Sequence, residues 1–203
     1  MNIIYQDEHL IAVDKPEGLL SVPGLGEANQ DCVATRLLEI NPEVKIVHRL
    51  DCYTSGIMIL AIGIEVQRNL SRQFHDRKVN KQYVAVVHGI LNEQQGTIDI
   101  PMRGDPDDRP RQIVDYQQGK SSKTHWTVIH AENNRTRLLL KPVTGRTHQL
   151  RVHCKAIGHT VVGDGLYGND GEKEKRMLLH AEIIKFLHPV TDKDMSLKAP
   201  CEF

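Results

Sequence analysis

The sequence predicts an α+β domain built on a large, mixed but mostly antiparallel sheet with a few flanking helices. Short apolar runs separated by polar turns indicate many strands, three segments have helical spacing, and no repeat or Pro/Gly/Ser-rich linker divides the chain. Its 203 residues are 39% hydrophobic and 26% charged, a composition typical of globular proteins with a substantial core. We therefore expect a single domain spanning residues 1–203.

Strands are expected throughout the chain. Residues 3–5 and 10–13 are apolar runs on either side of a polar turn, which predicts a hairpin. Residues 57–62 form a run too short for a buried helix and rich in β-branched side chains, which predicts a central strand. Alternation over residues 82–87 places Tyr83, Ala85 and Val87 on one face. Further strands are expected at residues 97–100, 112–115, 124–129, 136–140, 178–186 and 195–198.

Three segments are expected to be helical. Residues 33–40 repeat apolar side chains on one face and end before Asn41-Pro42, and residues 66–74 repeat them at i, i+4 and i+8. Over residues 147–157, Leu150, Cys154 and Ile157 share a face, and Gly158 follows as a C-terminal cap.

Cysteine spacing and hydropathy indicate a cytoplasmic protein. The four cysteines form no C-x-x-C pair, so free thiols in a reducing compartment are expected. The longest apolar run has six residues, whereas a bilayer crossing needs about 20. The N-terminus also lacks the basic region and apolar core of an export signal, so no membrane association is expected.

The charges balance overall but are unevenly distributed. Lys+Arg and Asp+Glu each number 26, which argues against a whole-surface attraction to polyanions. Residues 133–163, however, contain no acidic side chain and six basic ones: Arg135, Arg137, Lys141, Arg146, Arg151 and Lys155. Taken alone, such a run is more often a solvated face than a binding surface.

Two motif matches are weak. Gly163 to Gly168 reads G-x-G-x-x-G, but only Val161-Val162 precede it where a dinucleotide site needs a full strand, so a glycine-rich turn is expected. His148 and His153 are five residues apart, which would turn them away from each other on a helix, and no carboxylate lies near them in the run. We expect no metal site.

The informative segment is residues 48–56, directly before the expected central strand. A carboxylate such as Asp51, at the mouth of a buried strand, loses solvation and needs a cation. Arg49 and Arg151 are the candidates. On these residues alone, a structural ion pair that closes a loop is as good an explanation as a catalytic carboxylate.

The same segment resembles the H-R-L-D-x-x-T-S-G loop of the RluA family of pseudouridine synthases. Three further stretches match that family in order: Lys81-Gln82-Tyr83, the stretch from Pro142 to His153 continuing through Gly158-His159 and Val162-Gly163-Asp164, and Leu178-Leu179-His180-Ala181. The matches span residues 3–200. The resemblance is to short stand-alone members, because the catalytic pattern begins by Ile3 and leaves no room for the S4-like RNA-binding domain that many members carry.

This resemblance implies the pseudouridine synthase catalytic fold with a central active-site cleft, and a cofactor-independent isomerisation of uridine. Its substrates would be a large-subunit ribosomal RNA loop and a tRNA anticodon loop. Asp51 would be the catalytic aspartate, Arg151 its compensating cation, and Tyr83 the aromatic residue that stacks on the uracil. Arg49 would enter the space left by the flipped base, and Arg146, Lys141 and Lys155 would contact phosphates.

Two other functions remain open from the sequence. A non-catalytic RNA-binding or ribosome-assembly module on the same fold would use the basic run but would have no need for Asp51, Tyr83 and Arg151 together. A hydrolase of N-glycosidic bonds would use similar carboxylate chemistry but would release free base. The sequence shows no heptads or large apolar stripe, so a monomer is expected.

Overall fold

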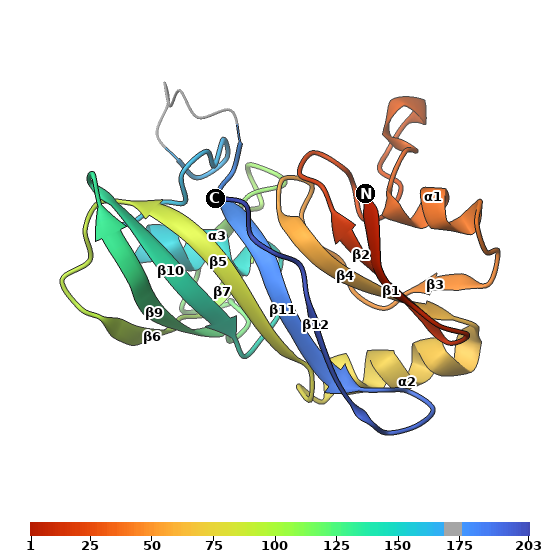
Figure 1. The fold of residues 1–203 in the computed structure, drawn as a ribbon. Coiled ribbons are helices and arrows are strands. Elements are labelled where there is room, and N and C mark those ends of the chain that lie inside the picture. The colour runs from red at the N-terminus through yellow and green to blue at the C-terminus, as the bar shows by residue number, and fades with distance from the viewer. Residues whose placement is uncertain (169–175) are drawn as a thin grey trace. The chain divides into compact units, whose positions relative to one another are not determined.

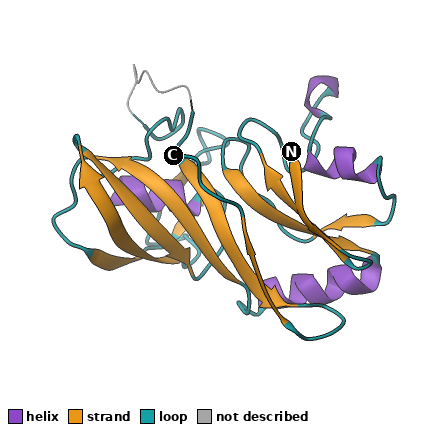
Figure 2. Cartoon of the chain, in the orientation of Figure 1, coloured by secondary structure: helices purple, strands orange, loops and turns teal. Residues whose placement is uncertain are grey.

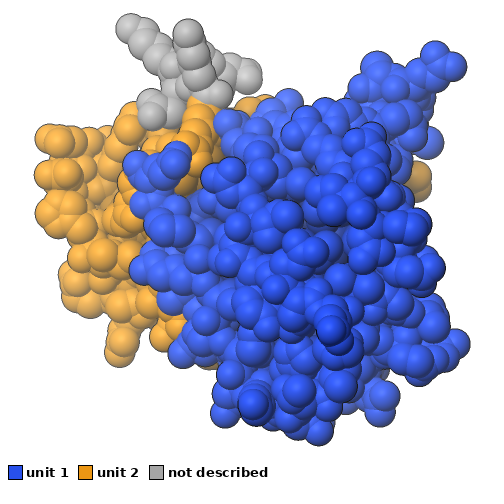
Figure 3. Space-filling model, turned by 45° about the vertical axis from the view of Figure 1, so that its right-hand side comes forward, with its two compact units in different colours: residues 1–81, 180–202 blue, residues 82–179, 203 orange. Residues whose placement is uncertain are grey.

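Strands dominate the chain, and a few helices accompany them (Figures 1 and 2). The computed structural model describes residues 1–168 and 176–203. These residues form two compact units, coloured separately in Figure 3: unit 1 contains residues 1–81 and 180–202, and unit 2 contains residues 82–179 and 203. The α+β class is confirmed. The expectation of one catalytic domain spanning residues 1–203 stays a prediction.

Unit 1 is organised around its most buried strand, β4. Its strands are β1 (Asn2–Gln6), β2 (Leu10–Lys15), β3 (Val44–Ile46), β4 (Ser55–Ile62), β11 (Leu179–Leu187) and β12 (Asp194–Lys198). β2 pairs antiparallel with one edge of β4 and forms a hairpin with β1. On the other edge, β11 pairs in parallel with the first two residues of β4, and β3 pairs antiparallel with its last three. β12 pairs with β11.

The burial of β4 explains its sequence. Seven of its eight residues are buried, so both of its faces must be apolar, and the predicted central strand is confirmed. α2 (Ile64–His75) packs against β4 and β3, and α1 (Val33–Leu38) packs against β3. A 3₁₀ turn, η1 (Glu27–Asn29), precedes α1.

Unit 2 contains a four-stranded antiparallel sheet and a small separate hairpin. Its elements are β5 (Asn80–His88), β6 (Gln95–Asp99), β7 (Met102–Gly104), β8 (Gln112–Val114), β9 (Lys123–Glu132), β10 (Arg135–Pro142) and α3 (Gln149–Ala156). The larger sheet has the order β5-β10-β9-β6, and β7 pairs with β8.

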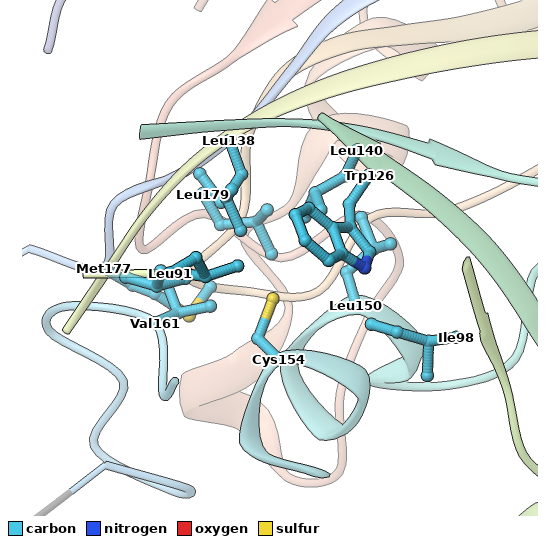
Figure 4. Packing of buried hydrophobic residues seen from close by; sticks show 12 residues of the cluster. Leu91, Ile98, Trp126, Leu138, Leu140, Leu150, Cys154, Val161, Met177 and Leu179 are labelled. Atoms are coloured by element: carbon cyan, nitrogen blue, oxygen red, sulfur yellow. The ribbon is translucent and has the colours of Figure 1, made fainter. Parts of the chain in front are cut away.

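The core of unit 2 lies between α3 and this sheet. Figure 4 shows Leu150 and Cys154 of α3 pointing toward Trp126, Leu138 and Leu140 of the strands. These side chains belong to one buried cluster. The predicted apolar face of the helix is therefore confirmed, and so is the predicted inward face of β5, because Ala85 and Val87 join the same cluster and Tyr83 packs against it.

The expected elements are present, with two omissions and some shifted ends. β3 and β7 were not predicted. Each has only three residues, which gives little alternation to detect, although β8, of the same length, was expected as residues 112–115. The helix expected from residue 147 begins at Gln149, since His148 adopts a left-handed conformation with φ 53°. α1 ends at Leu38 rather than at residue 40. Residues 163–168 form the expected turn.

Gly56, the last residue of the T-S-G stretch, lies where β4 meets β11. Its φ is 110°, a region that L side chains rarely adopt, and a Cβ there would lie 2.3 Å from the carbonyl oxygen of Ala181. Only glycine allows the parallel pairing of β4 with β11 at this point.

We predict that Gly56→Ala destabilises the protein by about 3 kcal/mol or more, because the new methyl group collides with backbone that cannot move aside. Chemical denaturation measures this loss. The matched control is Gly165→Ala, where nothing lies within 4 Å of the added Cβ and φ is outside the left-handed region, so the stability should change by less than about 0.5 kcal/mol. Equal stabilities of the two variants would contradict this explanation.

Candidate active site

Asp51 lies in a tight turn just before β4. We call residues 47–54 the Asp51 loop. The amide of Thr54 donates to the carbonyl of Asp51 at 3.1 Å and closes the turn. Leu50 and Thr54 are buried, Asp51 is partly buried, and Arg49 is exposed. The loop is thus anchored by two side chains, while the side chain of Asp51 keeps access to solvent.

A buried lysine binds the backbone of this loop. Lys15, at the end of β2, is 0% exposed, and its ammonium group donates to the carbonyls of Pro16 (2.9 Å), Leu19 (2.7 Å) and Cys52 (2.8 Å). Burial lowers the pKa of Lys15 to about 8, and the neighbouring Cys52 and Asp51 side chains oppose that shift. The ammonium form therefore predominates at pH 7 and gives Asp51 a nearby cation that the sequence analysis missed.

Ser21 supports the same loop from a second side. Its hydroxyl donates to the carbonyl of Leu50 at 2.7 Å and accepts from the amide of Leu50 at 3.0 Å. The thiol of Cys52 donates to the carbonyl of Gly18 at 3.2 Å, and the amide of Gly18 donates back to the carbonyl of Cys52. The segment that follows β2 is therefore bonded to the Asp51 loop on both sides of the aspartate.

The end of the loop is fixed by a buried serine–histidine contact. Ser55 Oγ lies 2.9 Å from Nδ1 of His180, and His180 Nε2 lies 3.0 Å from the carbonyl oxygen of Ala199. A carbonyl can only accept, so Nε2 donates to Ala199. His180 therefore links the start of β4 to the segment after β12, and both side chains are buried.

His48 fixes the start of the loop. Its Nε2 accepts a hydrogen bond from the amide of Ile59 at 3.0 Å, and its ring stacks on Phe74 of α2 with centroids 4.6 Å apart. Burial and the nearby Lys81 lower the pKa of His48 to about 3, so the ring stays neutral and remains an acceptor. This histidine is part of the scaffold of the loop.

Unit 2 holds the other two predicted catalytic residues. Tyr83 is partly buried on β5, opposite Leu140 of β10. Arg151, on α3, is 4% exposed and forms a double hydrogen bond with Asp164: Nε to Oδ2 and Nη2 to Oδ1, each at 2.7 Å. The arginine lowers the pKa of Asp164 despite its burial. The expected pairing of Arg151 with Asp51 stays a prediction.

Tyr167 contacts Arg151 and several of its neighbours. Its ring centroid lies 4.9 Å from Cζ of Arg151 and 5.8 Å from Nζ of Lys155. Its hydroxyl accepts from the amide of Gln112 at 2.8 Å and lies 2.7 Å from Nδ1 of His148. The turn that contains Asp164 and Tyr167 therefore positions Arg151, which explains the G-x-G-x-x-G match without a nucleotide.

The predicted phosphate-binding residues fall into two groups. Arg146 is exposed just before α3, and Lys155 is exposed on α3 one turn after Arg151. Lys141 is also exposed, but its neighbour Leu140 points into the core beside Tyr83, so Lys141 projects from the opposite face of the sheet. Only Arg146 and Lys155 belong to the helix side of this unit.

Sequence reasoning gave no functional role to Lys15, Ser21, Asp164, Tyr167 or His180. The burial of Lys15 could have been predicted from the sequence. Lys15 lies two residues after Val13, the last residue of the buried run from Leu10, and side chains two residues apart on a strand point to the same face. The pairing of Arg151 with Asp164 could not have been predicted in this way, because it depends on how the chain turns back after α3.

Within residues 1–168 and 176–203, no group of three or more His, Cys, Asp or Glu side chains could hold a metal ion. No helix in these ranges is both long and apolar enough to cross a membrane.

Comparison with known proteins decides the family. A model of the RNA pseudouridylate synthase family matches residues 9–156. The chain belongs to this family. It is 44% identical to the dual-specificity RNA pseudouridine synthase RluA of Escherichia coli K12, over 99% of this chain and 93% of that protein, and 43% identical to the RluA of Yersinia pestis over the whole of both. The solved structure of human RNA pseudouridylate synthase domain containing 1 superposes with a TM-score of 0.81 at 30% identity, covering 98% of this chain and 82% of that one.

The chain is therefore an RNA pseudouridine synthase, an isomerase that acts on RNA. The predicted family and fold are confirmed. The catalytic and binding roles of individual residues stay predictions.

The buried side chain of His153 predicts that the stability of this synthase depends on pH. His153 is fully buried, its Nε2 donates to Ser122 Oγ at 2.8 Å, and Ser122 in turn donates to the carbonyl of Ile100. Its Nδ1 finds no partner among the described residues. Burial lowers the pKa of His153 to about 4. Between pH 6.5 and 4 the unfolded chain therefore binds a proton at this residue that the folded chain does not.

We predict that stability is fully present above pH 6.5 and falls as the pH drops toward 4, with His153 contributing about 3 kcal/mol to the loss. Denaturation midpoints measured across this range test the slope. His153→Gln can keep a donor to Ser122 and should bind about one proton fewer on unfolding between pH 6.5 and 4 than the unaltered protein does. A slope identical to that of the unaltered protein would show that His153 does not titrate as described.

Proposed function

We propose that this synthase isomerises uridines in large-subunit ribosomal RNA and in a tRNA anticodon loop, in the cytoplasm, as a monomer and without a cofactor. The observation that carries the proposal is the rigid Asp51 loop, which presents one carboxylate on a backbone fixed by Lys15, Ser21 and Ser55. The relatives that match nearly the whole chain are named dual-specificity enzymes, which supports more than one class of RNA substrate.

The reaction needs no change of oxidation state. The N1–C1′ bond of uridine breaks, the uracil turns, a C5–C1′ bond forms, and the proton on C5 is lost as N1 gains one. We assign the catalytic step to Asp51, whose carboxylate can attack C1′, add to C6 of the base, or remove a proton from C2′. Each of these routes requires the ionised carboxylate, so a positive neighbourhood favours all three.

Two residues of unit 2 complete the proposed mechanism. Tyr83 offers a ring that stacks on the detached uracil and a hydroxyl that can take part in proton transfer. Arg151 supplies the compensating cation for Asp51. The pair with Asp164 uses its Nε and Nη2, so the guanidinium is held at a fixed angle with Nη1 outside that pair. Asp164 is then a positioning residue for Arg151.

The target base must leave its stack to reach Asp51, which costs a few kcal/mol. Arg49 is exposed two residues before Asp51 on the same fixed loop. We propose that its flat guanidinium occupies the space that the base leaves, and so recovers part of the lost stacking.

We predict that Asp51→Asn lowers turnover at least about a thousandfold while RNA affinity changes little, because the substitution removes the charge but nearly keeps the shape. The test incubates the purified protein and the variant with unmodified total RNA and no added cofactor, followed by nucleoside mass analysis and position mapping. Pseudouridine formed by the unaltered protein alone supports the proposal. A variant that still forms pseudouridine would exclude the role of Asp51, and free uracil would indicate a hydrolase.

We also predict that Arg146→Ala and Lys155→Ala each weaken RNA binding and reduce the slope of log K against log salt by about one, since each loses one phosphate contact. Lys141→Ala provides a matched comparison: it also removes one exposed positive charge, but from the opposite face of the sheet, and its effect should be smaller. Titrations at several salt concentrations measure the slopes. A larger effect for Lys141 than for the other two would indicate that RNA binds on the face of the sheet opposite α3.

A further inference from the structure

Tyr53 is an exposed aromatic side chain on the Asp51 loop. The chain has nine Phe, Trp and Tyr residues, and only two of them are exposed: Tyr53 at 57% and Tyr116 at 78%. An exposed ring contributes little to the core, so packing does not account for a tyrosine at position 53.

The backbone on both sides of Tyr53 is fixed. Lys15 holds the carbonyl of Cys52, and the amide of Thr54 bonds to the carbonyl of Asp51. The side chain of Thr54 is buried. The ring is therefore displayed by a rigid turn, and ordering it against a ligand costs only its own two side-chain torsions.

The exposed side chains of the loop are arranged about the aspartate. Arg49 precedes Asp51 by two residues and Tyr53 follows it by two, whereas Leu50 and Thr54 are buried. Two residues of chain span at most about 7 Å, so a nucleotide bonded to one whose base reaches Asp51 lies within reach of Tyr53. Arg49 is proposed to fill the space that the flipped base leaves, but bases in single-stranded RNA loops are often unstacked themselves, and a tyrosine ring can stack on such a base next to the target.

We propose that Tyr53 forms a stacking subsite for the base adjacent to the target uridine. This inference rests on the proposed function and adds a residue that selects RNA by the nucleotide next to the target. Stacking of one base on one aromatic ring corresponds to about a 5- to 100-fold effect on affinity, so the subsite would influence which RNA loops are modified.

The test uses a stem-loop RNA transcribed around a uridine that position mapping identifies. Its turnover by the unaltered protein is measured first. Affinity is then measured in the Asp51→Asn protein, which binds without converting the RNA, with Tyr53→Ala, Tyr53→Phe or Tyr53→Leu added. Tyr116→Ala is the matched control, because it removes the other exposed aromatic ring.

We expect Tyr53→Ala and Tyr53→Leu to raise Kd about 5- to 100-fold, and Tyr53→Phe and Tyr116→Ala to change it less than about twofold. With the Asp51 carboxylate restored, Tyr53→Ala should raise KM far more than it lowers kcat, which separates a binding role from damage to the loop. Full affinity in Tyr53→Ala, or a leucine that replaces the tyrosine without loss, would overturn the proposal.

An abasic nucleotide on either side of the uridine identifies the stacked base. At one of the two positions it should weaken binding to the unsubstituted Tyr53 protein and add no further loss to Tyr53→Ala, whereas independent losses at both positions would refute stacking. If the unaltered protein converts no RNA, the proposed function fails and this subsite fails with it. If the unaltered protein converts the RNA but the losses of affinity at both abasic positions are independent of Tyr53, only the subsite is rejected.

Discussion

A buried ammonium group determines where Asp51 can lie. Lys15 is removed from water, and its three hydrogen bonds go to backbone carbonyls, one of them in the Asp51 loop. A buried charge that lost these partners would cost several kcal/mol, so the carbonyls must stay in place for the fold to be stable. The position of the Asp51 backbone is thereby tied to the stability of unit 1. Ser21 and His180 also hold the loop and its end through hydrogen bonds.

Unit 2 uses a charge pair for a similar purpose. Arg151 and Asp164 are buried together, and removing either would leave the other uncompensated at a cost of about 3–5 kcal/mol. Arg151→Ala would therefore report on folding as much as on catalysis. Arg151→Lys, which keeps the charge but loses the double hydrogen bond, separates the two effects better. In both units the groups that hold Asp51 and Arg151 also stabilise the fold.

The fold class and the longer elements could be predicted from the sequence because buried faces require apolar side chains at regular spacings. β4 reads as a continuous apolar run and α3 as an apolar stripe, and both were confirmed. The catalytic role of Asp51 was predicted from its loop and the family resemblance of that loop, and it stays a prediction. The partners of the loop were not predicted, since contacts such as Ser55 with His180 join residues 125 positions apart and depend on strand order. β3 and β7, two of the three strands with only three residues, were too short to leave a pattern that was recognised.

The Asp51 loop is held in place by hydrogen bonds although several of its side chains are exposed. Lys15 donates a hydrogen bond to the carbonyl of Cys52, and Ser21 donates one to the carbonyl of Leu50. The carbonyl of Asp51 accepts from the amide of Thr54 and closes the turn. These bonds engage main-chain atoms, and the roles proposed for residues 49, 51 and 53 use their side chains. A carboxylate, a guanidinium and an aromatic ring held on one fixed backbone can then meet three parts of an RNA at once, and the ordering cost of binding falls mainly on the RNA.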